Sequence, residues 1–127
     1  MDEMMDESME DCIEECRNCA EICTETVFRC LELGGKHAER KHIAMLMNCA
    51  SLCSTSARFM LSGSEFHILT CAACAEVCEA CADECDALGP EMSECAEACR
   101  SCAQLCFEMA GGDEPGNGPR SDPELRA

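Results

Sequence analysis

Residues 74–85, CAEVCEACADEC, carry the pattern that decides the fold. The pattern occurs twice more, as CIEECRNCAEIC at 12–23 and as CAEACRSCAQLC at 95–106. All three stretches share the spacing C-x3-C-x2-C-A-x2-C. Because steps of three and four residues return to the same side of an α-helix, each stretch predicts a helix with its cysteines on one face. A fourth copy at 49–60, CASLCSTSARFM, keeps only its first two cysteines.

Glycine and proline breakers divide the chain into four segments of helix length. The breakers are Gly34-Gly35, Gly63, Gly89-Pro90 and Gly111-Gly112. The segments run over about 6–33, 37–62, 65–88 and 91–110. Short connections between such helices favour an all-α, antiparallel up-down-up-down four-helix bundle over residues 1–110, with a Cys-lined core. Residues 111–127 contain three of the four prolines and almost nothing apolar, which predicts a disordered, acidic Gly/Pro-rich tail.

The composition makes cysteine essential to the core. The 127 residues include 16 Cys and nine Met but no Trp or Tyr, and the net charge is −17. So little hydrocarbon with so much charge is typical of disordered chains. A buried cysteine, however, behaves as a small apolar side chain, so the inward stripes supply a sulfur-rich interior. Small side chains alone would leave that interior underpacked, which indicates that it holds something more.

Charge and chain ends restrict the partners and the compartment. Nine basic residues against 26 acidic ones argue against binding to nucleic acid or to an anionic membrane. The first eight residues, MDEMMDES, contain neither a basic region nor an apolar run, so we expect a cytoplasmic protein without a secretory signal. The cytoplasm keeps thiols reduced, and a high cysteine content there indicates metal or redox chemistry rather than a disulfide framework.

Charge also separates the metals that thiolates prefer, namely Cu(I), Zn(II) and iron–sulfur clusters. Zinc at four sulfurs per ion would bring about +8 to sixteen thiolates and leave about −8 in a narrow core. Iron–sulfur cubanes would leave a comparable charge and need more width than helices about 8–10 Å apart allow. Cu(I) at roughly one ion per thiolate cancels the charge, and a C-x3-C pair on successive helical turns can hold one ion.

The four cysteine-bearing helices resemble the cytosolic copper storage proteins, a family of four-helix bundles, over about Asp11–Met109. The resemblance implies multiple Cu(I) ions held by inward thiolates for storage or detoxification, a homotetramer, and metal entry at a bundle end furnished with His or Met. The second helix departs from the pattern, which predicts a lower capacity there. The predicted ligands are Cys12, Cys16, Cys19, Cys23, Cys30, Cys49, Cys53, Cys71, Cys74, Cys78, Cys81, Cys85, Cys95, Cys99, Cys102 and Cys106.

Tracing four antiparallel helices at about 1.5 Å per residue assigns the soft donors to two ends of the bundle. One end has Cys12 together with Met9, Met60, His67 and Met109. The other end has Cys30, His42, Cys85, Met92 and Cys95. Thioether and imidazole hold Cu(I) more loosely than thiolate, so the Met-rich end with His67 is the candidate for metal entry. Methionine at a bundle end equally often fills gaps in packing, and this alternative stays open.

The second segment also predicts a subunit contact. Between Ile43 and Leu61 the only charged residue is Arg58, and Met47 and Phe59 add apolar surface beyond the inward stripe. A helix that is apolar on more than one face is usually buried on more than one side. The polar residues within this segment make a membrane span improbable. We therefore expect this helix to contact a second copy of the chain.

Two other functions remain as alternatives. A thiol-redox or iron–sulfur electron-transfer protein would use C-x2-C pairs such as Cys16/Cys19 or Cys71/Cys74. Reactive thiols, however, need partly exposed electropositive surroundings, and those here are acidic. A zinc-buffering protein differs from the leading hypothesis only in its ion. We expect no enzyme, because the sequence has no nucleophile–base–acid arrangement and no phosphate-binding loop.

Overall fold

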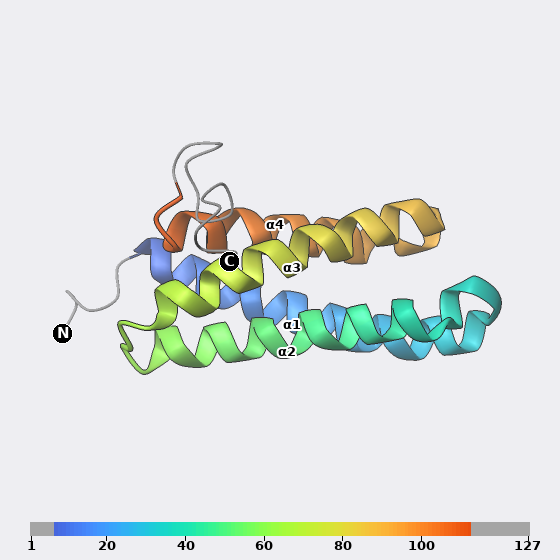
Figure 1. Ribbon diagram of the computed structural model, residues 1–127, viewed down its shortest axis with the longest axis horizontal. Coiled ribbons are helices and arrows are strands. Elements are labelled where there is room, and N and C mark those ends of the chain that lie inside the picture. The colour runs from blue at the N-terminus through green and yellow to red at the C-terminus, as the bar shows by residue number, and fades with distance from the viewer. Residues whose placement is uncertain (1–6, 113–127) are drawn as a thin grey trace, which may run out of the picture.

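The structure, a computed structural model, describes residues 7–112, and these form four α-helices joined by short connections. The helices are α1 (Glu7–Leu33), α2 (Arg40–Leu61), α3 (His67–Leu88) and α4 (Ser93–Met109). Two 3-10 turns, η2 (Gly35–Ala38) and η3 (Pro90–Met92), precede α2 and α4. Successive helices run in opposite directions along the long axis of the molecule (Figure 1). This is the expected up-down-up-down bundle.

Three helices begin two or three residues later than the sequence indicated. The third was expected from residue 65 and begins at His67, and the other two share one reason. The second was expected from residue 37 and the fourth from residue 91, but each is preceded by a 3-10 turn. Gly34, just before η2, and Gly35, its first residue, have positive φ angles of 72° and 59°, which turn the chain at this point. Pro90 begins η3, where its missing N–H is no loss. These two turns contain the first residues of the segments that the sequence analysis assigned to the second and fourth helices.

The core is a column of sulfur along the bundle axis. All sixteen cysteines are buried as free thiols. Contacts across the core show the antiparallel register, because Cys12 Sγ lies 3.8 Å from Cys106 Sγ while Cys23 Sγ lies 3.8 Å from Cys95 Sγ. The largest fully buried side chains are Leu46, Met60 and Met92. Hydrocarbon therefore fills little of the interior.

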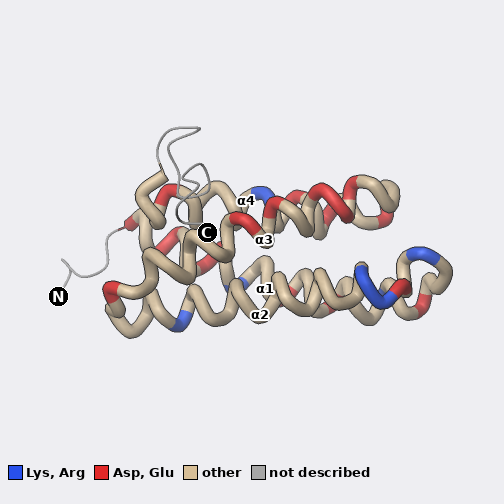
Figure 2. The backbone as a smooth tube through the Cα atoms, viewed as in Figure 1, with Lys and Arg blue, Asp and Glu red and all other residues tan. Residues whose placement is uncertain are grey.

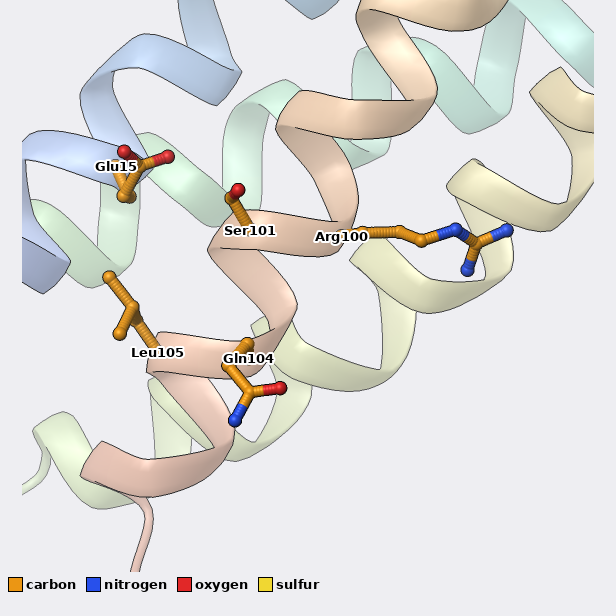
Figure 3. A pocket seen from close by; sticks show the side chains of 5 residues that line it. All are labelled: Glu15, Arg100, Ser101, Gln104 and Leu105. Atoms are coloured by element: carbon orange, nitrogen blue, oxygen red, sulfur yellow. The ribbon is translucent and has the colours of Figure 1, made fainter.

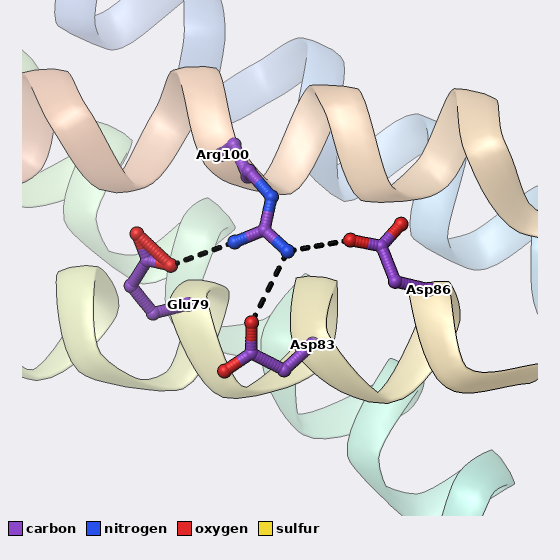
Figure 4. Close-up of polar contacts among 4 residues, drawn as sticks. All are labelled: Glu79, Asp83, Asp86 and Arg100. Carbon is purple, nitrogen blue, oxygen red and sulfur yellow. Dashed lines mark hydrogen bonds and ion pairs between the residues drawn. The ribbon is translucent and has the colours of Figure 1, made fainter.

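Charged residues are unevenly distributed over the surface. Figure 2 shows Asp and Glu along α3 and α4, and Lys and Arg gathered around the connection between α1 and α2. On the acidic side, Arg100 of α4 reaches across to three carboxylates of α3 (Figure 4). Its guanidinium lies 3.0 Å from Glu79, 3.1 Å from Asp83 and 2.6 Å from Asp86. Within residues 7–112, no helix is both long and apolar enough to span a bilayer.

A glycine turn ends α4. After α4, the N–H of Gly112 donates to the carbonyl of Phe107 at 2.9 Å, and that of Gly111 to Glu108 at 3.0 Å. The tail expected from residue 111 lies outside the described residues from 113 onward.

Candidate metal centre

The inward cysteines form five groups, in each of which all the Sγ atoms lie within 4.8 Å of one another. Four groups contain four thiols and the fifth contains three, and every member is buried. Along the axis the groups are Cys12/Cys71/Cys106, Cys16/Cys74/Cys102/Cys106, Cys19/Cys53/Cys78/Cys102, Cys19/Cys23/Cys49/Cys99 and Cys23/Cys81/Cys95/Cys99.

The groups are linked because neighbours share cysteines. Cys106 belongs to the first two groups, Cys102 to the second and third, and Cys19 to the third and fourth. Cys23 and Cys99 together join the last two. A shared thiolate can bridge two metal ions, so the arrangement suits a continuous polynuclear cluster better than a row of separate sites. Sequence periodicity predicted that the cysteines face inward, but it could not show which of them would share a group.

The distances between thiols match those around a coordinated ion. Sγ atoms of Cys49 and Cys78 are 3.5 Å apart, and those of Cys53 and Cys78 are 3.6 Å apart. A tetrahedral ion with metal–sulfur bonds of about 2.3 Å holds its sulfurs about 3.8 Å apart. The thiols are therefore already placed for ligation, and only small side-chain movements are needed to admit an ion.

Thiols in this column perturb one another's acidity. Hydrogen bonds from Cys102 and Cys106 lower the pKa of Cys16 to about 6. At Cys71 the hydrogen bond with Cys106 favours the thiolate, but the hydrogen bond with Cys12 and burial outweigh it and raise the pKa to about 12. A buried cluster cannot carry many unbalanced negative charges, so most thiols in the empty column keep their protons until a cation replaces them.

Two cysteines, Cys30 and Cys85, lie outside the five groups. Hydrogen bonds with Cys81 and Cys95 raise the pKa of Cys85, which still adjoins the column. Cys30 differs, because its hydrogen-bonding neighbours are an imidazole and a thioether. Its Sγ lies 3.4 Å from Nε2 of His42 and 3.6 Å from Sδ of Met92.

The residues expected at metal entry all lie where α1 and α3 begin and α2 and α4 end. Met60 is fully buried, while Met9 and Met109 pack against the core and stay partly accessible. The ring Nδ1 of His67 lies 2.8 Å from the carbonyl oxygen of Ser64. The structure therefore places the four residues at one end of the bundle.

Two features of the core escaped the sequence analysis. Ser56 stands at the third cysteine position of the copy at 49–60, and its hydroxyl is fully buried with no hydrogen-bond partner among the described residues. Glu84 was not singled out at all, yet its Oε1 lies 3.2 Å from Nδ1 of His42. Helical spacing placed Glu84 beside the stripe, but only tertiary packing brings it to a histidine on another helix.

The surface hollow between α1 and α4 does not compete with the column as a functional site. It has a volume of about 440 Å³. Figure 3 shows Glu15 on one side and Ser101, Gln104 and Leu105 on the other, with the Arg100 guanidinium directed away from them. Its polar groups do not converge on a ligand position.

Comparison with known families agrees with this arrangement of thiols. A family model described as copper storage protein matches residues 5–111. The chain belongs to the copper storage protein family. The search of curated proteins found no significant match to the sequence.

Solved structures of similar chains support the same conclusion. A protein of Nitrosospira multiformis is 44% identical, with a TM-score of 0.81, and the match covers 84% of this chain and 98% of that one. A Cu(I)-bound copper storage protein, BsCsp3, is 35% identical over 82% of this chain and 99% of its own, with a TM-score of 0.76. The apo form of Csp3 from Bacillus subtilis is 36% identical over 80% and 97%, with a TM-score of 0.72. The predicted family and fold are thereby confirmed.

Proposed function

We propose that this member of the copper storage protein family stores Cu(I) at roughly one ion per cysteine, with all sixteen cysteines as ligands. The observation that carries the proposal is the sharing of thiols between successive groups along a fully buried column. Bridging thiolates allow as many ions as sulfurs, whereas separate four-sulfur sites would need four sulfurs for each ion. BsCsp3, a relative of this chain, has a structure with Cu(I) bound.

Charge supports Cu(I) over zinc for this chain. The distances between thiols alone would suit a tetrahedral zinc ion as well. However, Cys19, Cys23, Cys99, Cys102 and Cys106 each serve two groups, so the column lacks enough thiols for an independent zinc ion in every group. A monovalent ion for each thiolate leaves the buried column neutral, whereas zinc would leave an excess of buried negative charge.

An anaerobic titration of the fully reduced protein tests the proposal. Cu(I) is added in the presence of a coloured Cu(I) chelator, and native mass spectrometry counts the bound ions at the endpoint. We expect about sixteen ions per chain, all bound in preference to the chelator. A parallel titration with Zn(II) is the control. Uptake of only a few Cu(I) ions, or tighter binding of about four Zn(II), would contradict copper storage.

Metal entry is assigned to the end of the bundle that bears Met9, Met60, His67 and Met109. The assignment rests on their common position and on the accessible edges of Met9 and Met109. Replacing the three methionines by Leu and His67 by Gln should slow copper uptake, measured by stopped flow, without changing the final number of ions. A matched variant is Met47→Leu, because Met47 lies on the exposed surface. Equal uptake rates in both variants would overturn the assignment.

A homo-oligomer formed through α2, a tetramer as the resemblance implies, is the proposed assembly. Phe28 of α1 is 64% exposed and Met47 of α2 is 55% exposed. Both line an apolar surface hollow of about 260 Å³ between the two helices. Burying such side chains against another copy removes apolar surface from water. Light scattering should therefore give a mass above that of one chain, and Met47→Glu should lower it; a monomer of the unaltered protein would contradict the contact.

Storage in the cytoplasm, rather than catalysis, is the remaining part of the proposal. The thiols are buried and surrounded by acidic surface, whereas nucleophilic cysteines need partly exposed positive surroundings. The five thiol groups, filled with Cu(I), would leave no free ligand position for a substrate. The strongly acidic surface also disfavours nucleic acid and anionic membranes as partners.

A further inference from the structure

The bundle end formed by η2 and η3 contains three donor types side by side. Cys30 of α1 contributes a thiol, His42 of α2 an imidazole and Met92 of η3 a thioether. All three are buried, and His42 is only 4% exposed. Cys30 Sγ lies 3.4 Å from His42 Nε2 and 3.6 Å from Met92 Sδ. Two segments that are distant from α1 in the sequence therefore bring a nitrogen and a sulfur donor against the Cys30 thiol.

The spacing of these atoms suits one three-coordinate ion. With bonds of about 2.3 Å to sulfur and about 2.0 Å to nitrogen, trigonal geometry separates sulfur from nitrogen by about 3.7 Å and sulfur from sulfur by about 4.0 Å. The two separations measured from Cys30 Sγ, 3.4 Å and 3.6 Å, are shorter than these by only a few tenths of an ångström. Entry of an ion would require the donors to move apart slightly rather than to converge.

Glu84 of α3 fixes the orientation of the imidazole. Its Oε1 lies 3.2 Å from Nδ1 of His42. A carboxylate accepts hydrogen bonds and does not donate them, so Nδ1 carries the proton and the lone pair of Nε2 faces Cys30. Metal-binding histidines are commonly held in this way by a carboxylate behind the ring. Neither copper ligation by thiols alone nor simple core packing requires that arrangement.

We propose that Cys30, His42 and Met92 form a separate site for one Cu(I) ion, with Glu84 as its positioning residue. The proposal rests on copper storage as the proposed function. It adds one Cu(I) ion whose ligands differ from those of the ions in the thiol groups. A thiolate, a neutral imidazole and a thioether are soft donors, and with Cu(I) their total charge is zero. Because Cys30 belongs to none of the five thiol groups, this ion would have a terminal thiolate instead of bridging ones.

The test follows the imidazole nitrogens by NMR. The chain has three histidines, so a ¹⁵N-histidine sample gives three pairs of ring-nitrogen signals, and His42→Gln identifies the pair that belongs to His42. During an anaerobic Cu(I) titration, we expect the Nε2 signal of His42 to shift. Native mass spectrometry should find one ion fewer in His42→Gln than in the unaltered protein.

Three further variants make the test specific. Met92→Leu keeps the volume but removes the thioether, and Glu84→Ala removes the acceptor behind the ring; both should weaken the shift at His42 and leave the thiol groups able to fill. His37→Gln is the matched control, because His37 lies at the same end but is paired with Glu91 at 3.5 Å. It should change neither the count of ions nor the His42 signal.

The outcomes separate this site from copper storage as a whole. Full loading of the protein while the His42 signal stays in place would overturn the mixed-donor site and leave storage intact. A shift at His42 with one bound ion and no further uptake would support the site and contradict storage by the column. If His42→Gln fails to fold, the titration of the unaltered protein and of Met92→Leu still decides between these outcomes.

Discussion

Ser56 shows what the second helix loses by departing from the repeated pattern. It occupies the third cysteine position of the motif, and its hydroxyl is fully buried with no partner in residues 7–112. An unsatisfied buried polar group costs about 1–3 kcal/mol. The position therefore reduces stability and contributes no sulfur to the column.

Replacing Ser56 separates these two effects. Ser56→Ala removes the unpaired hydroxyl, so we expect the free energy of unfolding of the copper-free protein to rise by about 1 kcal/mol, with copper capacity unchanged. Ser56→Cys should stabilise the protein similarly and bind about one more Cu(I) ion per chain. Urea unfolding and native mass spectrometry measure the two quantities. An unchanged ion count in Ser56→Cys would show that this position does not face the column.

Cys71 makes the empty protein sensitive to alkali. Its pKa is raised to about 12 from the ordinary 9.0, with the hydrogen bond to Cys106 opposing the rise and that to Cys12 and burial causing it. Since the folded pKa is the higher one, this thiol stabilises the fold below pH 9, and the contribution is lost as pH rises toward 12.

Alkaline unfolding of the reduced, copper-free protein should show this loss. A shift of this size corresponds to a contribution of up to about 4 kcal/mol. We expect the free energy of unfolding, measured in urea with a reductant present, to fall over this pH range. In Cys71→Ala the fall should be smaller. Parallel pH curves for the two proteins would argue against the raised pKa.

One arginine links α4 to the acidic face of α3. Arg100 of α4 contacts Glu79, Asp83 and Asp86, whose charges would otherwise repel one another along α3. The guanidinium is 42% exposed, so screening by water and salt limits its effect.

Arg100→Gln should destabilise the fold by about 1 kcal/mol at low salt, and the loss should shrink as salt is added. Arg58→Gln is the control, because it removes the same charge from an exposed site on α2. Thermal unfolding at several salt concentrations measures both variants. An equal effect of both substitutions would mean that only net charge, and not the contact with α3, matters.

At the level of helices, the sequence predicted most of the arrangement because one pattern carried both the helix period and the buried face. The turns were harder to place, since 3-10 geometry at Gly35–Ala38 and Pro90–Met92 depends on local backbone angles that periodicity does not report. Tracing the helices placed Cys30, His42 and Met92 at the same end of the bundle, but it could not predict the contacts between them. They arise where α1, α2 and η3 meet, and the three segments share no motif.

The molecule as a whole should become more stable as it fills. Ions that bind the folded state and not the unfolded chain stabilise it by mass action, by about 2.7 kcal/mol per site at a free-ion concentration one hundred times the Kd. The ion also fills space that small side chains leave open. Loading with Cu(I) should therefore raise Tm progressively, and removal by a chelator should reverse the rise. If the fully loaded protein had the same Tm as the copper-free protein, ligation in the core would be contradicted.

The buried, mutually hydrogen-bonded thiols have a consequence for the chemistry of the surrounding solution. A protonated thiol is neutral, and so is a thiolate joined to Cu(I). Each ion that enters therefore displaces about one proton, and a chain with 16 cysteines keeps its net charge near −17 from empty to full. Filling the bundle is thus an exchange of Cu(I) ions for protons, and it needs no additional counterions. For the same reason, a local fall in pH would favour release of the copper.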